Sequence, residues 1–301
     1  MSLLIIDKPI GPTSFAVVKR VRALLGKQRR EKVGHGGTLD PFASGVLPIC
    51  IGEGTKVLPF LLDADKSYEA VVRFGVETDT LDLTGHTVAE HPLGNLSAEI
   101  VEDALAGFRG PIAQVPPMYS ALKRDGRPLY SYARAGETVE RAVRPVTIHA
   151  LEMVAFEAPD RARLQVRCSK GTYIRSLAAD LGTRLGVGAH LVELRRTASG
   201  PFRLDQSITL DALAARIVDG RPLPILSLLA ALAHLPMVNV DEVQALVLER
   251  GQHMNWAAFS GGRELAGPTC AVRSSEGGRS LVAVVTQSPD GSVKILRGFQ
   301  R

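Results

Sequence analysis

The start of the chain combines a short apolar run with an amphipathic segment. Ser2–Ile6 is almost wholly apolar, and a run of this length predicts a buried strand. After a loop over Asp7–Pro12 that two prolines stiffen, apolar side chains recur at helical spacing, with Val17, Val21 and Leu24 on one face. The pattern therefore predicts a strand, a loop and a helix, in that order.

Strands and helices alternate through the middle of the chain. Tyr68–Phe74 alternates between apolar and polar side chains, as a half-buried strand does. Ser97 precedes an amphipathic stretch, so we expect it to cap a helix. Residues 177–185 carry leucines four positions apart, which is typical of a helix with one buried face. Two further strands are predicted, at Arg163–Arg167 and Val192–Arg196.

The last quarter of the chain has a different pattern of predicted elements. Leu226–Leu235 reads as an apolar helix that Pro236 ends. Beyond it, one short helix over Asp241–Arg250 is followed by glycine-rich β segments at Ser280–Thr286 and Val293–Leu296. We therefore expect a main domain over residues 1–235 and a separate small β domain over residues 236–301.

Residues 116–145 differ from the segments on either side. They are proline-rich at both ends, and tyrosines lie between their charged residues. The part from Tyr119 to Arg144 holds six Lys and Arg against three Asp and Glu, a composition suited to phosphates and bases together. The segment is interpreted as an inserted arm, spanning about residues 111–145, rather than as part of the core.

Positive charge is concentrated in two stretches of the chain. The net charge is +5, with an isoelectric point near 9.2. Residues 1–35 carry a net of +6 and residues 165–203 a net of +5, whereas residues 50–110 carry −7. Concentrated positive charge favours a phosphate backbone as partner. A basic face that only keeps the protein in solution is the alternative reading.

Several classes of protein are not favoured by the sequence. No apolar run is long enough to span a bilayer, and the N-terminus lacks the features of a signal peptide. Three widely spaced cysteines argue against a disulfide framework and indicate a reducing compartment, so a cytoplasmic location is expected. The chain of 301 residues is long enough for one sizeable core and a smaller companion domain.

Common cofactor and nucleophile motifs are also absent from the sequence. There is no Walker phosphate loop, and the Gly34–Gly37 turn lacks the spacing of a dinucleotide site. The histidines and cysteines show no spacing typical of metal ligands. Ser44 is not in the elbow motif of serine hydrolases. We therefore expect neither cofactor nor metal.

Asp40 is the candidate for chemistry, although its immediate context is ambiguous. It precedes a proline just after a glycine-rich turn, and an Asp in that position is commonly only a turn former. The run from Gly34 to Pro48 nevertheless keeps His35, Thr38, Asp40 and Ser44 close together on a loop that leads into an apolar segment.

This run and other ordered blocks resemble a known family. Gly34-His35-Gly36-Gly37-Thr38-Leu39-Asp40-Pro41-Phe42-Ala43-Ser44-Gly45-Val46-Leu47-Pro48 is similar to the catalytic motif of the bacterial tRNA pseudouridine-55 synthases, the TruB family. The resemblance covers about residues 3–210, and the tail matches less sharply. The other blocks are Asp7-Lys8-Pro9-x-Gly11-x-Thr13-Ser14, Asp65-Lys66-Ser67-Tyr68-Glu69, Pro117-Met118-Tyr119-Ser120-Ala121-Leu122-Lys123, Cys168-Ser169-Lys170-Gly171-Thr172-Tyr173-Ile174-Arg175 and Gly188-Ala189-His190-Leu191-x-x-Leu194-Arg195-Arg196-Thr197.

The resemblance implies a fold and an activity. The implied fold is the α/β (α+β) pseudouridine synthase fold, with a mixed, largely antiparallel central sheet flanked by helices and a small PUA-like, RNA-binding β domain at the C-terminus. The implied reaction is conversion of uridine 55 in the T-loop of tRNA to pseudouridine, by cleavage of the glycosidic bond, rotation of the base and reattachment through C5. A carboxylate suits the first step, and Asp40 is the residue implied.

The resemblance also implies roles for two residues beside Asp40. Arg175 would pair with Asp40 and keep it charged. A phosphate contact or a surface charge is the alternative for Arg175. Tyr68 would stack on the target base and take part in proton transfer at C5. A half-buried strand tyrosine is the alternative for Tyr68.

Four further residues are implied to bind substrate or support the site. The target base must leave its RNA loop, and His35 would stack in that loop as the base is extracted. A histidine packed in the turn is the alternative for His35. Tyr173 and Leu194 would line the pocket, or belong to the core. Lys8 would support the active-site loop or contact a phosphate.

Two other functions stay open at this point. The chain is expected to act on the tRNA T-stem-loop as a monomer, without a membrane or an obligate protein partner. One alternative is a pseudouridine synthase that works on other RNAs in a guide-RNA particle. The second alternative is a tRNA-folding chaperone whose catalysis is secondary. A glycoside hydrolase is disfavoured because the motif offers no second carboxylate.

Overall fold

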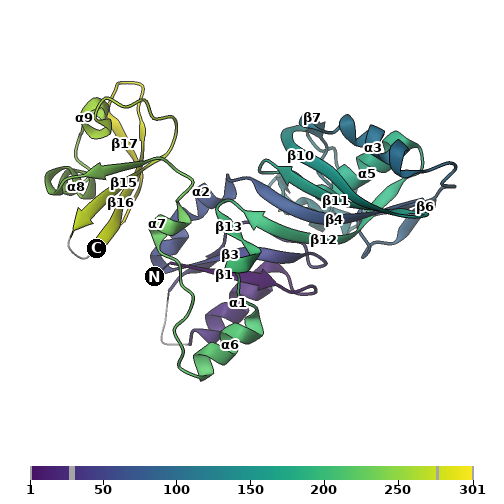
Figure 1. The fold of residues 1–301 in the computed structure, drawn as a ribbon, viewed down its shortest axis with the longest axis horizontal. Helices are drawn as coiled ribbons and strands as arrows, with labels where there is room; N and C mark the ends of the chain where they lie inside the picture. Colours follow the sequence, from purple (N-terminus) through teal and green to yellow (C-terminus); the bar gives the residue numbers. More distant parts are fainter. Residues whose placement is uncertain (1, 27–30, 276–277, 300–301) are drawn as a thin grey trace.

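A large mixed sheet forms the body of the molecule (Figure 1). The computed structural model describes residues 2–26, 31–275 and 278–299. Within these residues the sheet has nine strands. They are β1 (Leu3–Lys8), β2 (Val33–His35), β3 (Ser44–Ile51), β4 (Lys66–Phe74), β7 (Gly110–Gln114), β10 (Arg144–Glu157), β11 (Arg161–Cys168), β12 (Ala189–Ser199) and β13 (Phe202–Arg203).

The order of the strands brings early and late parts of the chain together. The path runs β1-β3-β12-β4-β11-β10-β7, with β2 beside β3 and β13 beside β12. Neighbouring strands are antiparallel, except that β3 and β12 run parallel. The prediction of a mixed, largely antiparallel central sheet is therefore confirmed.

Helices cover the sheet in two groups (Figure 1). In one group α3 and α5 pack against β10 and β12, and in the other α1 and α6 lie near β1 and β2. The helices are α1 (Ser14–Leu24), α2 (Leu58–Leu62), α3 (Ala98–Ala106), α4 (Leu129–Ala133), α5 (Ile174–Leu185), α6 (Leu210–Val218), α7 (Leu228–Ala231), α8 (Glu242–Glu249) and α9 (Trp256–Ser260), with 3-10 turns at Gly52–Val57 and Leu204–Gln206.

Capping residues begin both α1 and α3, and the cap of α3 is the predicted one. The Thr13 hydroxyl accepts a hydrogen bond from the Ala16 amide at the start of α1, and the Ser97 hydroxyl does the same for Ile100 at the start of α3. One prediction is wrong, because only Leu228–Ala231 of the expected helix over Leu226–Leu235 is helical. Leu226 instead exchanges backbone hydrogen bonds with Leu3, which keeps it extended beside β1.

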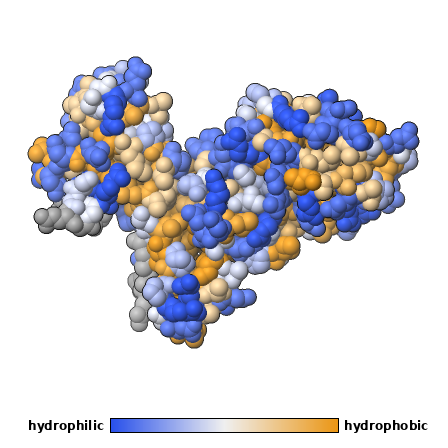
Figure 2. Space-filling view, in the orientation of Figure 1, coloured by the Kyte–Doolittle hydropathy of each residue, from blue (hydrophilic) through white to orange (hydrophobic). Residues whose placement is uncertain are grey.

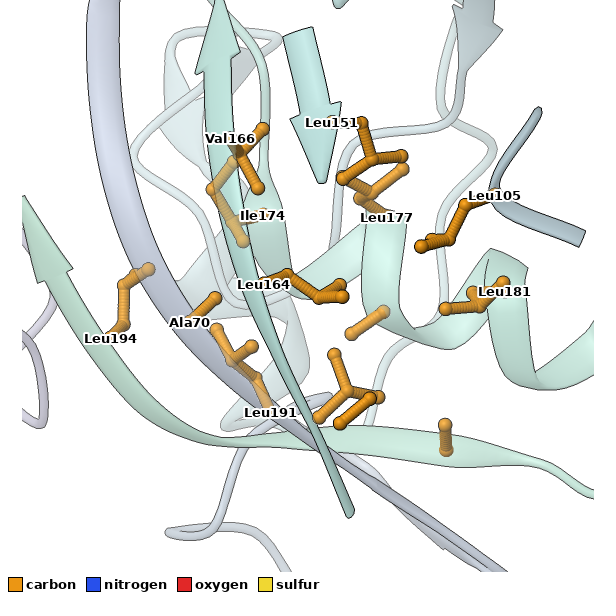
Figure 3. Close-up of a cluster of buried hydrophobic side chains, with 14 of the residues drawn as sticks. Ala70, Leu105, Leu151, Leu164, Val166, Ile174, Leu177, Leu181, Leu191 and Leu194 are labelled. Carbon is orange, nitrogen blue, oxygen red and sulfur yellow. The ribbon is translucent and has the colours of Figure 1, made fainter. Parts of the chain in front are cut away.

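The buried face of α5 fixes this helix on the sheet (Figure 3). Leu177 and Leu181 are at most 2% exposed and belong to one cluster with Leu164 of β11 and Leu191 of β12. Packing of this kind is the main source of stability for a short helix. It places the first turn of α5, which carries Arg175, at one end of the core.

Strand β12 joins the two halves of the sheet. Its Arg196 lies opposite Gly45 of β3 on one side and opposite Tyr68 of β4 on the other. Gly45 has a φ of +106°, and a Cβ atom there would lie 2.2 Å from the Arg196 carbonyl oxygen. Only glycine fits this approach. The loop before β3 is thereby brought next to β4.

The predicted arm leaves the sheet between two paired strands. β7 and β10 are antiparallel partners, with Gln114 opposite Arg144, so residues 115–143 leave and return at the same place. The Arg141 guanidinium donates a hydrogen bond of 2.9 Å to the Pro116 carbonyl across the base of this insertion. The arm carries a small hairpin and α4, and its strands are β8 (Lys123–Arg124) and β9 (Arg127–Pro128).

A second sheet lies in the C-terminal part of the chain, at the left of Figure 1. Its α8 begins at Glu242 with Asp241 as the N-cap, close to the predicted start, whereas the helix α9 was not expected. Cys270 and Phe299 share a buried cluster with Leu3 and Val46 of the large sheet, so the two sheets pack through a common apolar layer. The strands are β14 (Met237–Val240), β15 (Thr269–Ser275), β16 (Gly278–Gln287) and β17 (Val293–Gly298), in that order.

A further small two-stranded sheet pairs β5 (Val76–Thr78) with β6 (Thr87–Glu90).

The surface of the molecule is mostly hydrophilic (Figure 2), as expected when most apolar side chains are buried in the core. On the face in Figure 2, hydrophilic residues surround smaller apolar patches. No helix in the described part of the chain is long and apolar enough to cross a membrane.

Candidate active site

The loop that carries Asp40 is held from below by two buried side chains. The Ser14 hydroxyl, at the start of α1, donates to the Leu39 carbonyl at 3.0 Å and accepts from the Leu39 amide at 2.8 Å. The Lys8 ammonium donates to the Pro41 and Ala43 carbonyls, at 3.3 and 2.6 Å. Asp40 therefore stands between fixed backbone anchors.

The Asp40 carboxylate is gripped by a single guanidinium. Arg175 Nε donates to Oδ2 of Asp40 at 2.9 Å, and Arg175 Nη2 donates to Oδ1 at 3.1 Å. The Arg175 side chain is only 4% exposed, whereas that of Asp40 is 32% exposed. A two-pronged pair of this kind fixes both the position and the orientation of the carboxylate. The exposed side of Asp40 is left free to meet a reactant.

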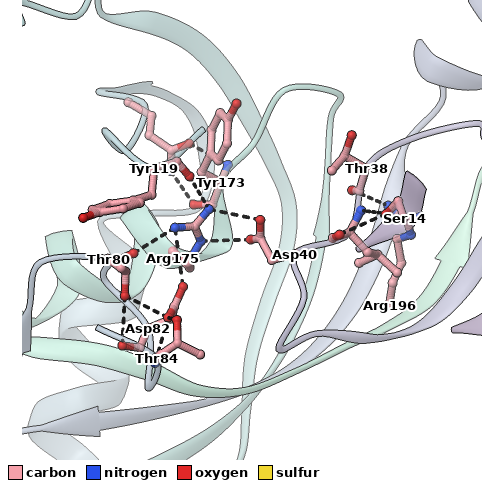
Figure 4. A network of polar contacts seen from close by, with 12 residues as sticks. Ser14, Thr38, Asp40, Thr80, Asp82, Thr84, Tyr119, Tyr173, Arg175 and Arg196 are labelled. Carbon is pink, nitrogen blue, oxygen red and sulfur yellow. Dashed lines mark hydrogen bonds and ion pairs between the residues drawn. The ribbon is translucent and has the colours of Figure 1, made fainter. Parts of the chain in front are cut away.

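Arg175 also binds two segments far from Asp40 in the sequence (Figure 4). Its Nη1 donates to the Thr80 carbonyl at 2.8 Å and lies 3.5 Å from Oδ2 of Asp82. Its Nη2 donates to the Tyr119 carbonyl of the arm at 2.8 Å. The same cation thus connects the Asp40 loop, the Thr80–Asp82 turn and the arm.

The charge of Asp40 is set by opposing influences. Burial raises the pKa of the Asp40 carboxyl above its usual value, and Arg175 opposes this rise. The negative charge of Asp82 adds to the rise. The net direction is upward, so Asp40 takes up a proton at a higher pH than an exposed aspartate does.

Two cavities meet at Asp40 and Arg175. One, of about 570 Å³, is lined by Tyr68, Tyr173 and Leu194. The other, of about 720 Å³, is lined by His35 together with residues of the arm and the Thr80–Asp82 turn. A pocket with apolar and aromatic walls and a few fixed polar groups is typical of a small-molecule or base site. The Asp40 carboxylate is accessible from both cavities.

The predicted pocket residues are brought together around the smaller cavity. Tyr68 projects from β4, Leu194 from β12, and Tyr173 immediately precedes α5. Burial raises the pKa of the Tyr68 hydroxyl, so Tyr68 is neutral near pH 7. The Gln114 side chain fixes the backbone of Tyr173 with two hydrogen bonds of 2.8 and 3.0 Å.

His35 and Lys8 take different places from these three residues. His35 lines the larger cavity, and burial lowers its pKa, which favours the neutral imidazole. Lys8 lies under the loop with no exposed surface and lines neither cavity. Burial lowers its pKa to about 8. Its hydrogen bonds to the Pro41 and Ala43 carbonyls support the loop, and a contact with a phosphate stays a prediction.

Three residues of this site carried no role in the sequence analysis. Asp82 was one of many acidic residues in a stretch of net negative charge. Ser14 follows Thr13, which caps α1, and Ser14 itself binds the Asp40 loop. Arg196 is 1% exposed and binds the carbonyls of Gly37, Thr38 and Val46, although an arginine is normally read as a surface residue. For Ser14 and Arg196 the only available signal was their inclusion in the ordered blocks, whereas Asp82 lies outside every block.

Metal ligands do not cluster in this site. Across residues 2–26, 31–275 and 278–299, no three His, Cys, Asp or Glu side chains lie together in a way that could hold a metal ion. Independence from metals and cofactors stays a prediction.

Proteins of known family share both sequence and fold with this chain. The family model described as TruB family pseudouridylate synthase (N terminal domain) matches residues 22–174, and that of the tRNA pseudouridylate synthase B C-terminal domain matches residues 175–229. The tRNA pseudouridine synthase B of Aromatoleum aromaticum is 52% identical over 83% of this chain and 80% of its own length. That of Azoarcus sp. is 50% identical over 84% and 82%.

Solved structures extend the similarity to the whole chain. A chain in a crystal structure of a Cbf5-Nop10-Gar1 complex is 28% identical with a TM-score of 0.77, and the match covers 99% of this chain and 84% of that chain. A chain in a structure of an H/ACA ribonucleoprotein bound to a substrate RNA is 27% identical with a TM-score of 0.74, over 99% and 85%. The resemblance seen in the motif blocks is confirmed, and the chain belongs to the TruB family of pseudouridine synthases.

Proposed function

We propose that this protein converts uridine to pseudouridine in tRNA, and that the target is position 55 in the T-loop. The observation that carries the proposal is the Asp40 carboxylate, held by Arg175 where two cavities meet. The reaction must break a bond at C1′ of a ribose while the base stays in place to rejoin. A fixed carboxylate at the edge of an aromatic pocket suits that task.

The smaller cavity supplies a place for the detached base. The ring of Tyr68 offers a stacking surface, and Leu194 and Tyr173 provide further apolar walls. Arg175 keeps Asp40 charged against the effect of burial. Asp40 would act on the sugar, and Tyr68 would then assist in removing the proton from C5.

RNA binding would use the rest of the large cavity and the arm. A uridine in a folded RNA loop must be flipped out to reach Asp40, which costs a few kcal/mol. His35 lines the larger cavity and not the one lined by Tyr68, and from there it would occupy space in the RNA loop. The arm would close over the RNA, because the Tyr119 carbonyl already touches Arg175.

The C-terminal sheet would add a second RNA contact. We propose that residues 1–235 form the catalytic domain and that residues 236–301 form a PUA-like RNA-binding domain. The similarity to solved structures covers 99% of the chain, and so includes this part. We further propose that the protein acts as a monomer without an obligate protein partner, in the cytoplasm.

The decisive experiment uses a bare T-stem-loop RNA with tritium at C5 of its uridines. Formation of pseudouridine releases the tritium, so purified protein should release one equivalent from position 55. Mapping of tRNA from cells that lack the protein should then show unmodified uridine at that position. Absence of tritium release from the bare stem-loop would contradict the proposal.

A guide-RNA particle is the second candidate. The matching solved structures include a Cbf5-Nop10-Gar1 complex and a ribonucleoprotein, which favours it. Relatives at 50% and 52% identity are named tRNA pseudouridine synthase B, which favours a stand-alone enzyme. If tritium release appears only after partner proteins and a guide RNA are added, the protein works in a guide-RNA particle.

Replacement of Tyr68 should separate stacking from proton transfer. Tyr68→Phe keeps the ring and removes the hydroxyl, so binding of the stem-loop should change less than about twofold. Release of the C5 proton should slow on the order of 100-fold, the usual contribution of a general acid or base. Tyr68→Leu removes the ring as well and should also weaken substrate binding. Equal tritium release from Tyr68→Phe and the unmodified enzyme would remove the hydroxyl from the mechanism.

Replacement of Asp82 should shift the pH profile of the reaction. The reaction needs ionised Asp40, so the single-turnover rate should fall as the pH falls through the pKa of Asp40, which lies above its ordinary value of 3.8. Asp82→Asn removes a negative charge that raises this pKa, so the acid limb should move to lower pH. Asp63→Asn, at an exposed ion pair with Lys170, should leave the limb unchanged. An acid limb that moves to higher pH in Asp82→Asn would contradict the assignment.

A further inference from the structure

Arg196 is a buried cation without an acidic partner. Three arginines are buried in the described part of the chain: Arg175, Arg196 and Arg273. Arg175 is paired with Asp40 and Asp82, and Arg273 with Glu242 and Glu249. No carboxylate of the described residues lies within ion-pair distance of Arg196. A buried charge without a counter-charge is unfavourable, so its presence calls for a reason.

The hydrogen bonds of Arg196 go to neutral carbonyls on both sides of the Asp40 loop. Its Nε donates to the Val46 carbonyl at 2.8 Å. Its Nη1 and Nη2 donate to the carbonyls of Thr38 and Gly37, at 3.2 and 3.1 Å (Figure 4). These bonds hold the two ends of the loop together. Carbonyl dipoles satisfy the donors but leave the net positive charge in place.

The position of Arg196 directs this charge toward the base pocket. Arg196 lies opposite Tyr68 in the pairing of β12 with β4, and it lines the 570 Å³ cavity with Tyr68 and Leu194. Its field reaches several neighbours. Burial is the first cause and Arg196 the second of the lowered pKa values of His35 and Lys66. The pocket is thus electropositive apart from the Arg175 pair, which Asp40 neutralises.

The proposed reaction places negative charge in this pocket. When the bond between C1′ and N1 breaks, the bonding electron pair leaves with N1, and the uracil carries one negative charge shared with O2 and O4. This holds whether Asp40 adds to C1′ or a ribose proton is removed first. The charge disappears when an electron pair of the uracil forms the bond between C5 and C1′. The C5 proton then passes to a base, and N1 takes up a proton. A fixed positive charge beside the base lowers the barrier to the first step, in which the negative charge develops.

We propose that Arg196 is a positioning residue with an electrostatic role: it clamps the Asp40 loop, and its unpaired charge stabilises the detached uracil anion. The inference rests on the proposed function, because it needs a base that leaves with the electron pair. Tyr68 and Arg196 then divide the work on the base. The ring of Tyr68 stacks on the uracil, and the Arg196 guanidinium next to Tyr68 stabilises the uracil in its anionic form.

The test compares two leaving groups in one stem-loop. A fluorine at C5 withdraws electrons and stabilises the uracil anion by itself, so 5-fluorouridine depends less on an external cation. Arg196→Gln keeps amide donors for the loop but removes the charge. Its single-turnover rate of rearrangement should fall about 100-fold with uridine and only about 10-fold with 5-fluorouridine. Stem-loop binding should stay within about twofold.

Two control variants separate charge from structure. Arg196→Lys keeps a charge but not the fork, and its rate with uridine should exceed that of Arg196→Gln. Arg73→Gln, at a partly exposed arginine of β4 paired with Asp160 at 2.9 Å, should stay within about twofold of the unmodified enzyme. If Arg196→Gln fails to fold, as judged by thermal unfolding, the same two substrates are compared in Arg196→Lys, whose smaller deficit should again shrink with 5-fluorouridine.

The outcomes are distinguishable. Equal deficits on uridine and 5-fluorouridine, in whichever of the two Arg196 variants folds, would overturn the electrostatic role and leave only the clamp. A deficit that shrinks with the fluorinated base supports it. If the unmodified enzyme rearranges neither substrate, the proposed function itself fails.

Discussion

Asp40→Asn is expected to bind the T-stem-loop like the unmodified protein and to show no measurable turnover. Asparagine fills the same space but can neither attack a sugar carbon nor hold the negative charge that Arg175 balances. Removal of a central catalytic carboxylate typically lowers the rate on the order of 10⁴-fold. Tritium release measures the rate, and a filter-binding titration measures the affinity.

The matched control is Asp63→Asn. Asp63 is exposed and its 2.8 Å ion pair with Lys170 lies on the surface, so activity should stay within about twofold. Robust turnover by Asp40→Asn would remove Asp40 from the mechanism. The same variant separates catalysis from an RNA-folding role, since a tRNA-folding chaperone would still support growth of a deletion strain when it carries Asp40→Asn.

Arg175→Lys should have the second largest effect. Lysine keeps the charge but cannot bind both oxygens of Asp40 and also reach the Thr80 and Tyr119 carbonyls. Displacement of a reacting group by about 1 Å commonly lowers the rate on the order of 100-fold. We expect a decrease of at least this size in single-turnover rate.

Arg163→Lys is the control for this substitution. Arg163 forms two partly exposed ion pairs, at 3.2 Å with Glu157 and 3.4 Å with Glu193, so its replacement should alter the rate less than about twofold. Near-normal turnover of Arg175→Lys would show that the two hydrogen bonds from Arg175 to the Asp40 carboxylate are dispensable, and that only a positive charge near Asp40 matters. A loss of stem-loop affinity equal to the loss of rate would instead indicate that Arg175 serves binding through the arm.

The parts of the fold with strong local patterns were predicted well from the sequence. The first helix, the helix with spaced leucines and the strand around Tyr68 have a one-sided apolar pattern, and each is present with nearly the expected bounds. Leu226–Leu235 failed because an apolar run suits a helix and a buried extended segment equally. Its pairing with Leu3, more than 200 residues earlier, decided the outcome and is invisible locally.

The site was predictable only where the motif blocks named its residues. Asp40 and Arg175 are 135 positions apart, and no local rule brings them together. Asp82 and Arg196 are harder still, because their roles depend on what surrounds them. Asp82 lies in an acidic stretch and Arg196 is the second of two adjacent arginines. In the sequence, both are therefore interpreted as surface charges. Only the packing of β12 between β3 and β4 makes Arg196 an interior cation.

The position of β12 between β3 and β4 also sets when the large sheet can be completed during synthesis on the ribosome. β3 and β4 follow each other closely in the chain, yet neither has its central neighbour until residues 189–199 emerge. At ordinary rates of synthesis this delay is on the order of ten seconds. During that time two strand edges are open to wrong partners. The Asp40 loop and the strand of Tyr68 are therefore joined only when β12 emerges, so the site is completed late in translation.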